Sequence, residues 1–150
     1  MRTLLCAIGV LTLGTACGGD GGRSVASESY RTFSLAQSAD SIPVRMGETV
    51  RVESILLTLT DLIADSRCPA QAYCVHPGDA EVVIRANAAC QPNCDVAQAT
   101  GRLHTMATPR AFVFQGRRIT LAWLLPLPVT PNTPPNPAEY VAWLKVVPQT

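Results

Sequence analysis

Four cysteines are the residues of this chain with the clearest capacity for redox or metal chemistry. Cys68 and Cys74 form one closely spaced pair, and Cys90 and Cys94 form a second. Four thiols can form two disulfides in three connectivities. A proline within each short loop favours a tight reversal. We therefore predict local pairing within each loop, with crossed pairing as the alternative.

Metal binding is the other chemistry open to the same four sulfurs, together with His76 and His104. Structural zinc sites usually place paired ligands two to four residues apart in both halves of the site, and Cys68 lies farther from Cys74 than that. A single histidine could also bind copper. The spacing favours disulfides, and we predict no metal and no other cofactor.

Polar side chains cluster in the sequence around the first cysteine pair. A candidate polar site consists of Asp65, Arg67, His76 and Asp79. A carboxylate at the end of a strand can accept N–H groups of the following loop, and Arg67 can pair with Asp61, Asp65 or Asp79. This pattern predicts a structural clamp. The alternative is that the four side chains converge as a small binding site.

The familiar catalytic motifs are absent from the sequence. It contains no Gly-x-Ser-x-Gly, no His-Glu-x-x-His, no phosphate-binding Gly-x-x-x-x-Gly-Lys and no glycine-rich dinucleotide turn. A hydrolase triad would have to assemble in space from His76 or His104, Ser66 and an aspartate. We therefore predict that the protein is not an enzyme.

The first seventeen residues have the order of an export signal. Arg2 is followed by an apolar run from Leu4 to Leu13 and by small residues at positions 14–16, directly before Cys17. This order resembles the lipobox of bacterial lipoproteins, in which the cysteine receives a diacylglyceryl group on sulfur and a third acyl chain on the new amine. The resemblance implies cleavage before Cys17, lipidation of Cys17 and a membrane partner. Plain secretion is the alternative.

Lipidation would keep the mature chain at a membrane, because two or more acyl chains anchor a protein stably. A Gly/Ser-rich stretch then extends to Ser29 and predicts a flexible linker with an end-to-end distance of about 20 Å. In a Gram-negative cell, the absence of aspartate at Gly18 resembles outer-membrane sorting, at the periplasmic face or the cell surface. Export also favours disulfides, because the cell envelope is oxidising.

The predicted organisation is a lipoprotein signal peptide at 1–16, a lipidated cysteine and linker at 17–29, and one domain at 30–150. The formal net charge is +1, and 15% of the residues are charged. These values give no basic face for nucleic acid. No segment after the leader approaches the roughly 18 apolar residues of a transmembrane helix.

Short runs of apolar and β-branched residues recur through the domain and predict strands. Ile55, Leu57 and Leu59 share one face of the longest run. Leu121, Trp123 and Leu125 are predicted to share a face in the same way. The predicted strands are Thr32 to Ala36, Ile42 to Met46, Thr49 to Glu53, Ser54 to Ile63, Glu81 to Asn87, Gly101 to Met106, Ala111 to Phe114, Arg118 to Leu125 and Glu139 to Val147.

About eight strands with regular turn signals and few helix signals indicate an all-β fold. We predict an antiparallel β-sandwich, Ig-like or jelly-roll-like, with a small β-barrel as the alternative. The proline-rich segment from Pro126 to Pro137 cannot donate ladder hydrogen bonds at its prolines. We interpret it as a stiff crossover between the sheets, with a docking loop for a partner as the alternative.

The stretch Asp65-Ser66-Arg67-Cys68-Pro69, followed by Cys74 and by Gly78-Asp79-Ala80, carries a local signature. It resembles a group of uncharacterised bacterial lipoproteins and secreted proteins with DSRCP, a second cysteine and a Gly-x-Ala step. The chain departs from that pattern at His76-Pro77. The resemblance implies a small β-domain with one shared disulfide, and it supplies no activity.

These observations lead to a functional hypothesis at the level of a class. We expect a lipid-anchored β-domain of the bacterial cell envelope that binds or supports an envelope protein or a small ligand without catalysis. One alternative is a secreted protease inhibitor that presents a loop to an enzyme cleft. Another is an envelope protein that binds metal.

Overall fold

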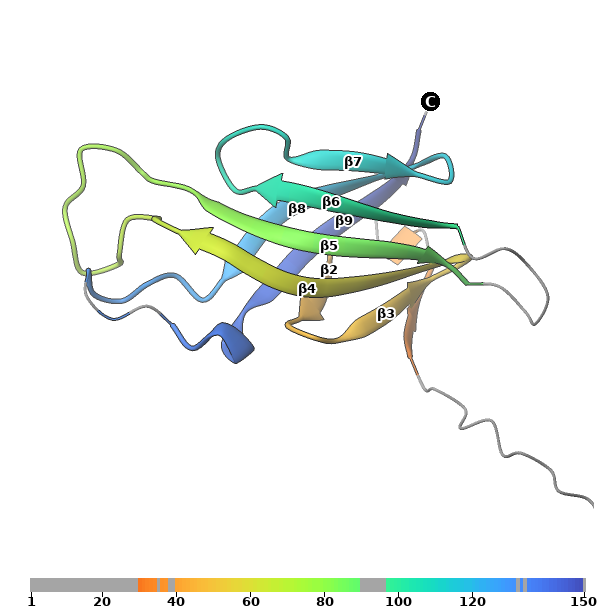
Figure 1. Ribbon diagram of the computed structural model, residues 1–150, viewed down its shortest axis with the longest axis horizontal. Coiled ribbons are helices and arrows are strands. Elements are labelled where there is room, and N and C mark those ends of the chain that lie inside the picture. The colour runs from red at the N-terminus through yellow and green to blue at the C-terminus, as the bar shows by residue number, and fades with distance from the viewer. Residues whose placement is uncertain are drawn as a thin grey trace, which may run out of the picture.

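A computed structural model describes residues 30–34, 36–37, 40–89, 97–131, 133 and 135–149. Within these residues the chain forms two packed β-sheets that do not close into a barrel, which confirms the predicted all-β sandwich (Figure 1). The strands are β1 (Arg31–Phe33), β2 (Ile42–Arg45), β3 (Thr49–Val52), β4 (Ile55–Asp65), β5 (Ala80–Ala88), β6 (Gln98–His104), β7 (Ala111–Phe114), β8 (Arg117–Leu125) and β9 (Val141–Pro148).

The first sheet has the strand order β1-β3-β4-β5-β6. All of its pairs are antiparallel except β1 with β3, which is parallel. Its longest pairing is between β4 and β5, in which Leu57 lies opposite Ala86 and Leu59 opposite Ile84. These residues are buried, as their alternation in the sequence requires for a strand with one covered face. The segment from Ser66 to Asp79 connects the end of β4 to the start of β5.

The second sheet has the order β2-β9-β8-β7 and is antiparallel throughout. A two-residue turn at Gln115 and Gly116 joins β7 to β8, and both residues have positive φ, 47° and 69°. Turns of this kind match the twist of hairpin strands. The core fills the space between the two sheets. Its fully buried members include Ile42, Val44, Val50, Ile55, Leu57, Leu59, Val82, Ile84, Leu103, Ile119, Leu121, Tyr140, Leu144 and Val146.

The face assignment within β8 corrects the sequence prediction. Leu121 is buried, but Trp123 and Leu125 are 58% and 45% exposed, and Leu124 is buried instead. The pairing with β9 shifts between Leu121 and Trp123, so Ala122 is an extra residue in the strand. Such a β-bulge displaces the following side chains by one position. The simple period of two therefore fails after Leu121.

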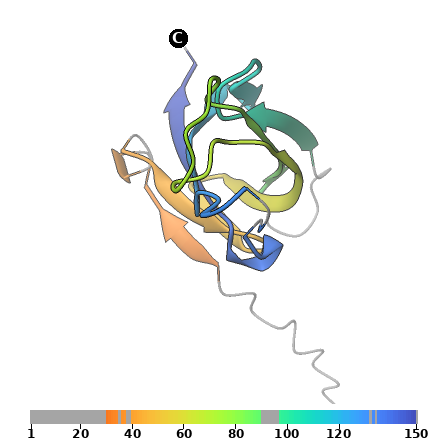
Figure 2. The ribbon, with the colours of Figure 1, turned by 90° about the vertical axis from the view of Figure 1, so that its left-hand side faces the viewer.

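The proline-rich segment also differs from its interpretation as a crossover between sheets. It joins β8 to β9, which are antiparallel neighbours within one sheet. It leads into the short 3-10 helix η1 (Pro137–Glu139) and lies at the same end of the sandwich as the loop from Ser66 to Asp79, the end that faces the viewer in Figure 2. The two segments are bonded, because Ala70 N–H donates to Pro128 O at 2.8 Å and Gln71 N–H donates to Val129 O at 3.1 Å.

Candidate functional site

The loop between β4 and β5 is closed by a disulfide between Cys68 and Cys74, whose Cα atoms are 5.9 Å apart. This is the local pairing predicted for the first two cysteines. Cys17, Cys90 and Cys94 lie outside the described residues. The bonded loop forms one wall of the candidate site, and the strand ends beside it supply the rest.

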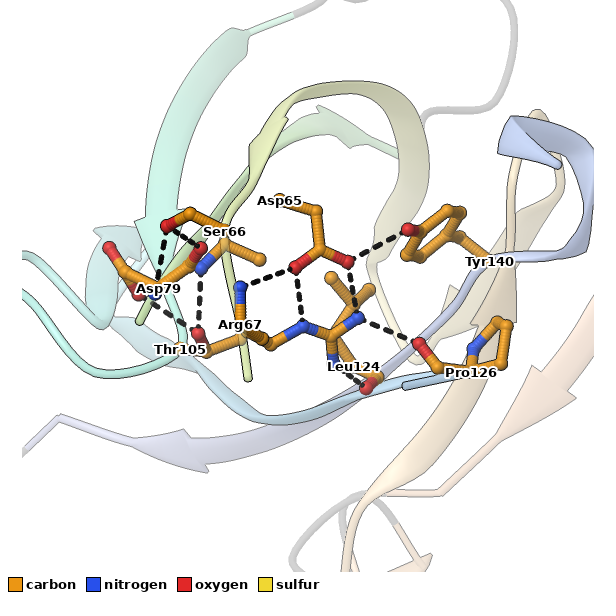
Figure 3. Close-up of polar contacts among 9 residues, drawn as sticks. Asp65, Ser66, Arg67, Asp79, Thr105, Leu124, Pro126 and Tyr140 are labelled. Atoms are coloured by element: carbon orange, nitrogen blue, oxygen red, sulfur yellow. Dashed lines mark hydrogen bonds and ion pairs between the residues drawn. The ribbon is translucent and has the colours of Figure 1, made fainter. Parts of the chain in front are cut away.

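Arg67 is the centre of a buried polar cluster, which we call the clamp (Figure 3). Its Nε and Nη2 donate to the two carboxylate oxygens of Asp65 at 2.8 and 2.6 Å. Its Nη1 donates to Leu124 O, and Nη2 also donates to Pro126 O at 2.7 Å. Tyr140 OH donates to Asp65 Oδ2 at 2.8 Å. The clamp therefore connects the exits of β4 and β8 to the entrance of β9.

The clamp holds two opposite charges away from water, where each charge needs a partner. The side chains of Arg67 and Asp65 are 7% and 4% exposed. Burial alone would raise the pKa of Asp65, but hydrogen bonds from Arg67 and Tyr140 outweigh it, so the pKa lies below its ordinary value. Burial and the bond to Asp65 raise the pKa of Tyr140 to about 12. The carboxylate, the guanidinium and the neutral phenol therefore form a mutually satisfied set.

Asp79 organises a second polar cluster at the entrance of β5. Its carboxylate accepts hydrogen bonds from Met106 N–H at 2.8 Å and Thr105 Oγ1 at 2.9 Å, and it lies 2.7 Å from His104 Nδ1. Burial alone would raise the pKa of Asp79, but these bonds hold it well below its ordinary value. Ser66 Oγ also donates to Asp79 O at 2.9 Å. Asp79 thus ties the loop of β4 to the end of β6.

Gly78 brings these two clusters together. Its φ is +68°, and a Cβ at this position would lie 1.8 Å from Ser66 O. Only glycine fits such a conformation and so close an approach of backbone. The Gly-x-Ala step of the sequence therefore has a structural cause.

The four residues of the predicted polar site do not lie in one cluster. Asp65 and Arg67 meet in the clamp, and of the three aspartates offered as partners for Arg67 it is Asp65 that pairs. Asp79 belongs to the second cluster. His76 is exposed and contacts none of the other three through a hydrogen bond within the described residues.

A cleft of about 480 Å³ opens beside the clamp, and sequence reasoning missed it. It lies between the disulfide loop, the turn after β6 and the end of β8. Its lining residues are Arg67, Cys68, Pro77, Thr105, Met106, Arg110, Ala122, Trp123, Leu124, Leu125 and Leu127. The unbroken apolar run from Leu121 to Leu125 was the available signal, because a half-buried strand should alternate.

The walls of the cleft are unusually apolar for exposed surface. Met106 is 60% exposed, Trp123 58%, Leu125 45% and Leu127 47%. Single exposed apolar residues are ordinary, but a contiguous group around a concave surface is typical of an interaction site. The bulge at Ala122 contributes by directing Trp123 and Leu125 outward.

The described residues contain neither a cluster of metal ligands nor a helix that could span a membrane. No group of three or more His, Cys, Asp and Glu side chains lies close enough together to hold a metal ion. No helix in this part has the length and apolar composition needed to span a membrane.

Comparison of the chain with protein-family models, with curated proteins and with solved structures finds no match.

Proposed function

We propose that the protein is a lipid-anchored, non-catalytic binding module of the cell envelope, and that its ligand occupies the cleft beside the disulfide loop. One observation carries the proposal: the large exposed apolar side chains of β8 and the turn after β6 surround one cleft with a volume of about 480 Å³. Small-molecule sites are clefts of roughly 300–1,000 Å³ with mainly apolar walls.

The surroundings of the cleft support a binding role because they are rigid. The disulfide and the clamp fix the wall formed by Cys68 and Arg67, and Asp79 fixes the turn that carries Met106. A site whose walls are already ordered loses less conformational entropy when a ligand binds. The membrane anchor is supported by the sequence alone, through the lipobox that ends at Cys17.

Oxidative footprinting tests whether the cleft is occupied. Methionine and tryptophan side chains react readily with oxidants when they are exposed. We expect Met106 and Trp123 to react several-fold more slowly in native membranes than in the purified full-length protein. Tyr73, which is fully exposed, has an oxidisable phenol and does not line the cleft, serves as the control and should react equally in both. Equal reactivity of Met106 and Trp123 in the two preparations would contradict the proposal.

Metabolic labelling with an alkyne-bearing fatty acid tests the anchor. The wild-type chain should incorporate the label and sediment with membranes, and Cys17→Ala should do neither. Cys68→Ala is a matched control, since that cysteine is bonded to Cys74 and is expected to carry no lipid. Undiminished labelling of Cys17→Ala would refute the lipoprotein assignment while leaving the footprinting result to be judged on its own.

A further inference from the structure

The charges that line the cleft are unbalanced. Arg67 and Arg110 are both lining residues, and no acidic side chain lines the cleft. The guanidinium of Arg67 is neutralised by Asp65 and bound by two carbonyl groups. Within the described residues, the side chain of Arg110 has no hydrogen-bond or ion-pair partner. The cleft therefore presents one uncompensated positive charge.

The backbone around Arg110 is held in place, so its side chain is presented at a defined point of the rim. Leu121 N–H donates to Arg110 O at 2.9 Å, and His104 N–H donates to Pro109 O at 3.0 Å. These bonds place Arg110 at the entrance of β7, between the end of β6 and the middle of β8, next to the bulge that exposes Trp123. The carboxylate of Asp79, at the entrance of β5, is occupied by its hydrogen bonds to Thr105 and Met106 and does not line the cleft.

The remainder of the cleft suits an apolar chain. Met106, Leu125 and Leu127 line it beside the indole of Trp123. Methionine adapts its shape to an irregular apolar partner, and an indole covers a large apolar area with few rotatable bonds. A ligand that fits both features has an apolar body and one anionic group.

We propose that the cleft binds a long-chain carboxylate, with the acyl chain against Met106, Trp123 and Leu125 and the carboxylate paired with Arg110. This inference rests on the proposed function and names its class of ligand. An arginine guanidinium pairs with a carboxylate through two parallel hydrogen bonds, which fixes the orientation of the ligand. A neutral chain of the same length would leave the arginine unpaired, and a cationic chain would be repelled by it.

Photoaffinity labelling of the full-length protein in its membranes tests the assignment. The probes are a sixteen-carbon carboxylic acid and the matching alcohol, each carrying a diazirine near the end of the chain, and labelled residues are identified by mass spectrometry. We expect the acid to label cleft residues about fivefold more than the alcohol, which is the size of effect that one exposed ion pair can give. Arg110→Gln should remove that preference. Arg118→Gln, an exposed arginine of β8 that does not line the cleft, should preserve it.

The outcomes separate this inference from the proposed function. Equal labelling of the cleft by acid and alcohol, unchanged in Arg110→Gln, would overturn the carboxylate assignment and leave a cleft for neutral apolar chains. Labelling by neither probe would overturn the ligand class altogether, while protection of Met106 and Trp123 in membranes would still support an occupied cleft. Loss of labelling by both probes in Trp123→Ser, together with loss of acid preference in Arg110→Gln, is the result that supports the proposal in full.

Discussion

At the scale of single residues, Arg67 connects parts of the chain that the sequence keeps far apart. Its guanidinium donates to Asp65, two residues earlier in the chain, to the carbonyl group of Leu124 in the other sheet and to that of Pro126, just after the end of β8. The strand-end position and the nearby acids predicted a clamp around this residue. The carbonyl partners and Tyr140 could not be predicted, because they become neighbours only through the packing of two sheets.

Replacement of Arg67 by methionine should destabilise the fold strongly. The variant would leave the Asp65 carboxylate buried without its charge partner and two carbonyl groups without donors, and removal of one member of a buried ion pair costs about 3–5 kcal/mol. Urea unfolding followed by tryptophan fluorescence measures the change. Arg102→Met is the matched control, because the Arg102 side chain is 65% exposed in its pair with Glu81 and its loss should cost at most about 1 kcal/mol. Similar losses in both variants would show that the clamp is not a stabilising feature.

Gly78 offers a second residue-scale prediction. Gly78→Ala would combine an unfavourable positive φ with overlap between the new Cβ and Ser66 O. Gly47 has a comparable φ of +75°, but a Cβ there would meet no atom within 4 Å. The free energy of unfolding of Gly47→Ala should therefore fall only by the roughly 1–2 kcal/mol that the left-handed conformation costs a residue with a Cβ. We expect Gly78→Ala to have the lower free energy of unfolding of the two. Equal values would mean that the loop shifts away without cost.

At the scale of elements, the strands were largely predictable and their irregularities were not. The alternation of Ile55, Leu57 and Leu59 in β4 identified the buried face of that strand, because one covered face imposes a period of two. In β8 the same rule failed at Ala122, since one extra residue reverses the faces that follow, and the unbroken apolar run from Leu121 to Leu125 does not show which residue is the extra one. That single bulge concealed the cleft. The proline-rich segment was also misplaced: its prolines suggested a stiff crossover between the sheets, whereas it joins two neighbouring strands of one sheet.

Deletion of Ala122 should preserve the fold. Leu121 pairs with Leu144 and Trp123 with Trp143, which are consecutive positions along the β9 ladder, so removal of the extra residue leaves a regular antiparallel register with Leu124 still buried. The acid preference in photolabelling should fall, because Ala122 lines the cleft and its loss moves Trp123 relative to Arg110.

Deletion of Lys145 from β9 is the control for that experiment. The pairing of β9 is regular there, so the deletion would turn the buried Val146 toward solvent and abolish cooperative unfolding. Circular dichroism and urea unfolding distinguish the two deletions. Equal damage from both would show that Ala122 is not a removable bulge residue.

At the scale of the whole molecule, the apolar core and the polar clusters occupy different parts of the sandwich. The core lies between the sheets, whereas the clamp and the cluster around Asp79 are at the end where the loops meet (Figures 2 and 3). Fixing these loops through ionised side chains makes the stability of the molecule depend on pH in a way that an apolar core alone would not.

The free energy of unfolding should be nearly constant over the middle of the pH range and should fall at both ends. Asp65 and Asp79 have folded pKa values below the ordinary 3.8, so the unfolded chain takes up protons first, and their stabilisation is lost as the pH falls below about 4. Tyr140 has a folded pKa of about 12 against an ordinary 10.0, so its contribution is complete below pH 10 and is lost as the pH rises to 12. One proton changes the stability by at most about 1.4 kcal/mol per pH unit.

Urea unfolding at a series of pH values, with single variants, assigns the two limbs of this profile. Tyr140→Phe should flatten the alkaline limb and leave the acid limb due to Asp79 in place. Asp79→Asn should weaken the acid limb and leave the alkaline limb unchanged, because the Asp79 carboxylate is bonded to His104, Thr105 and Met106 and not to Tyr140. An alkaline limb of full size in Tyr140→Phe would mean that another group titrates there, and the clamp would then lose its role in the pH dependence of the fold.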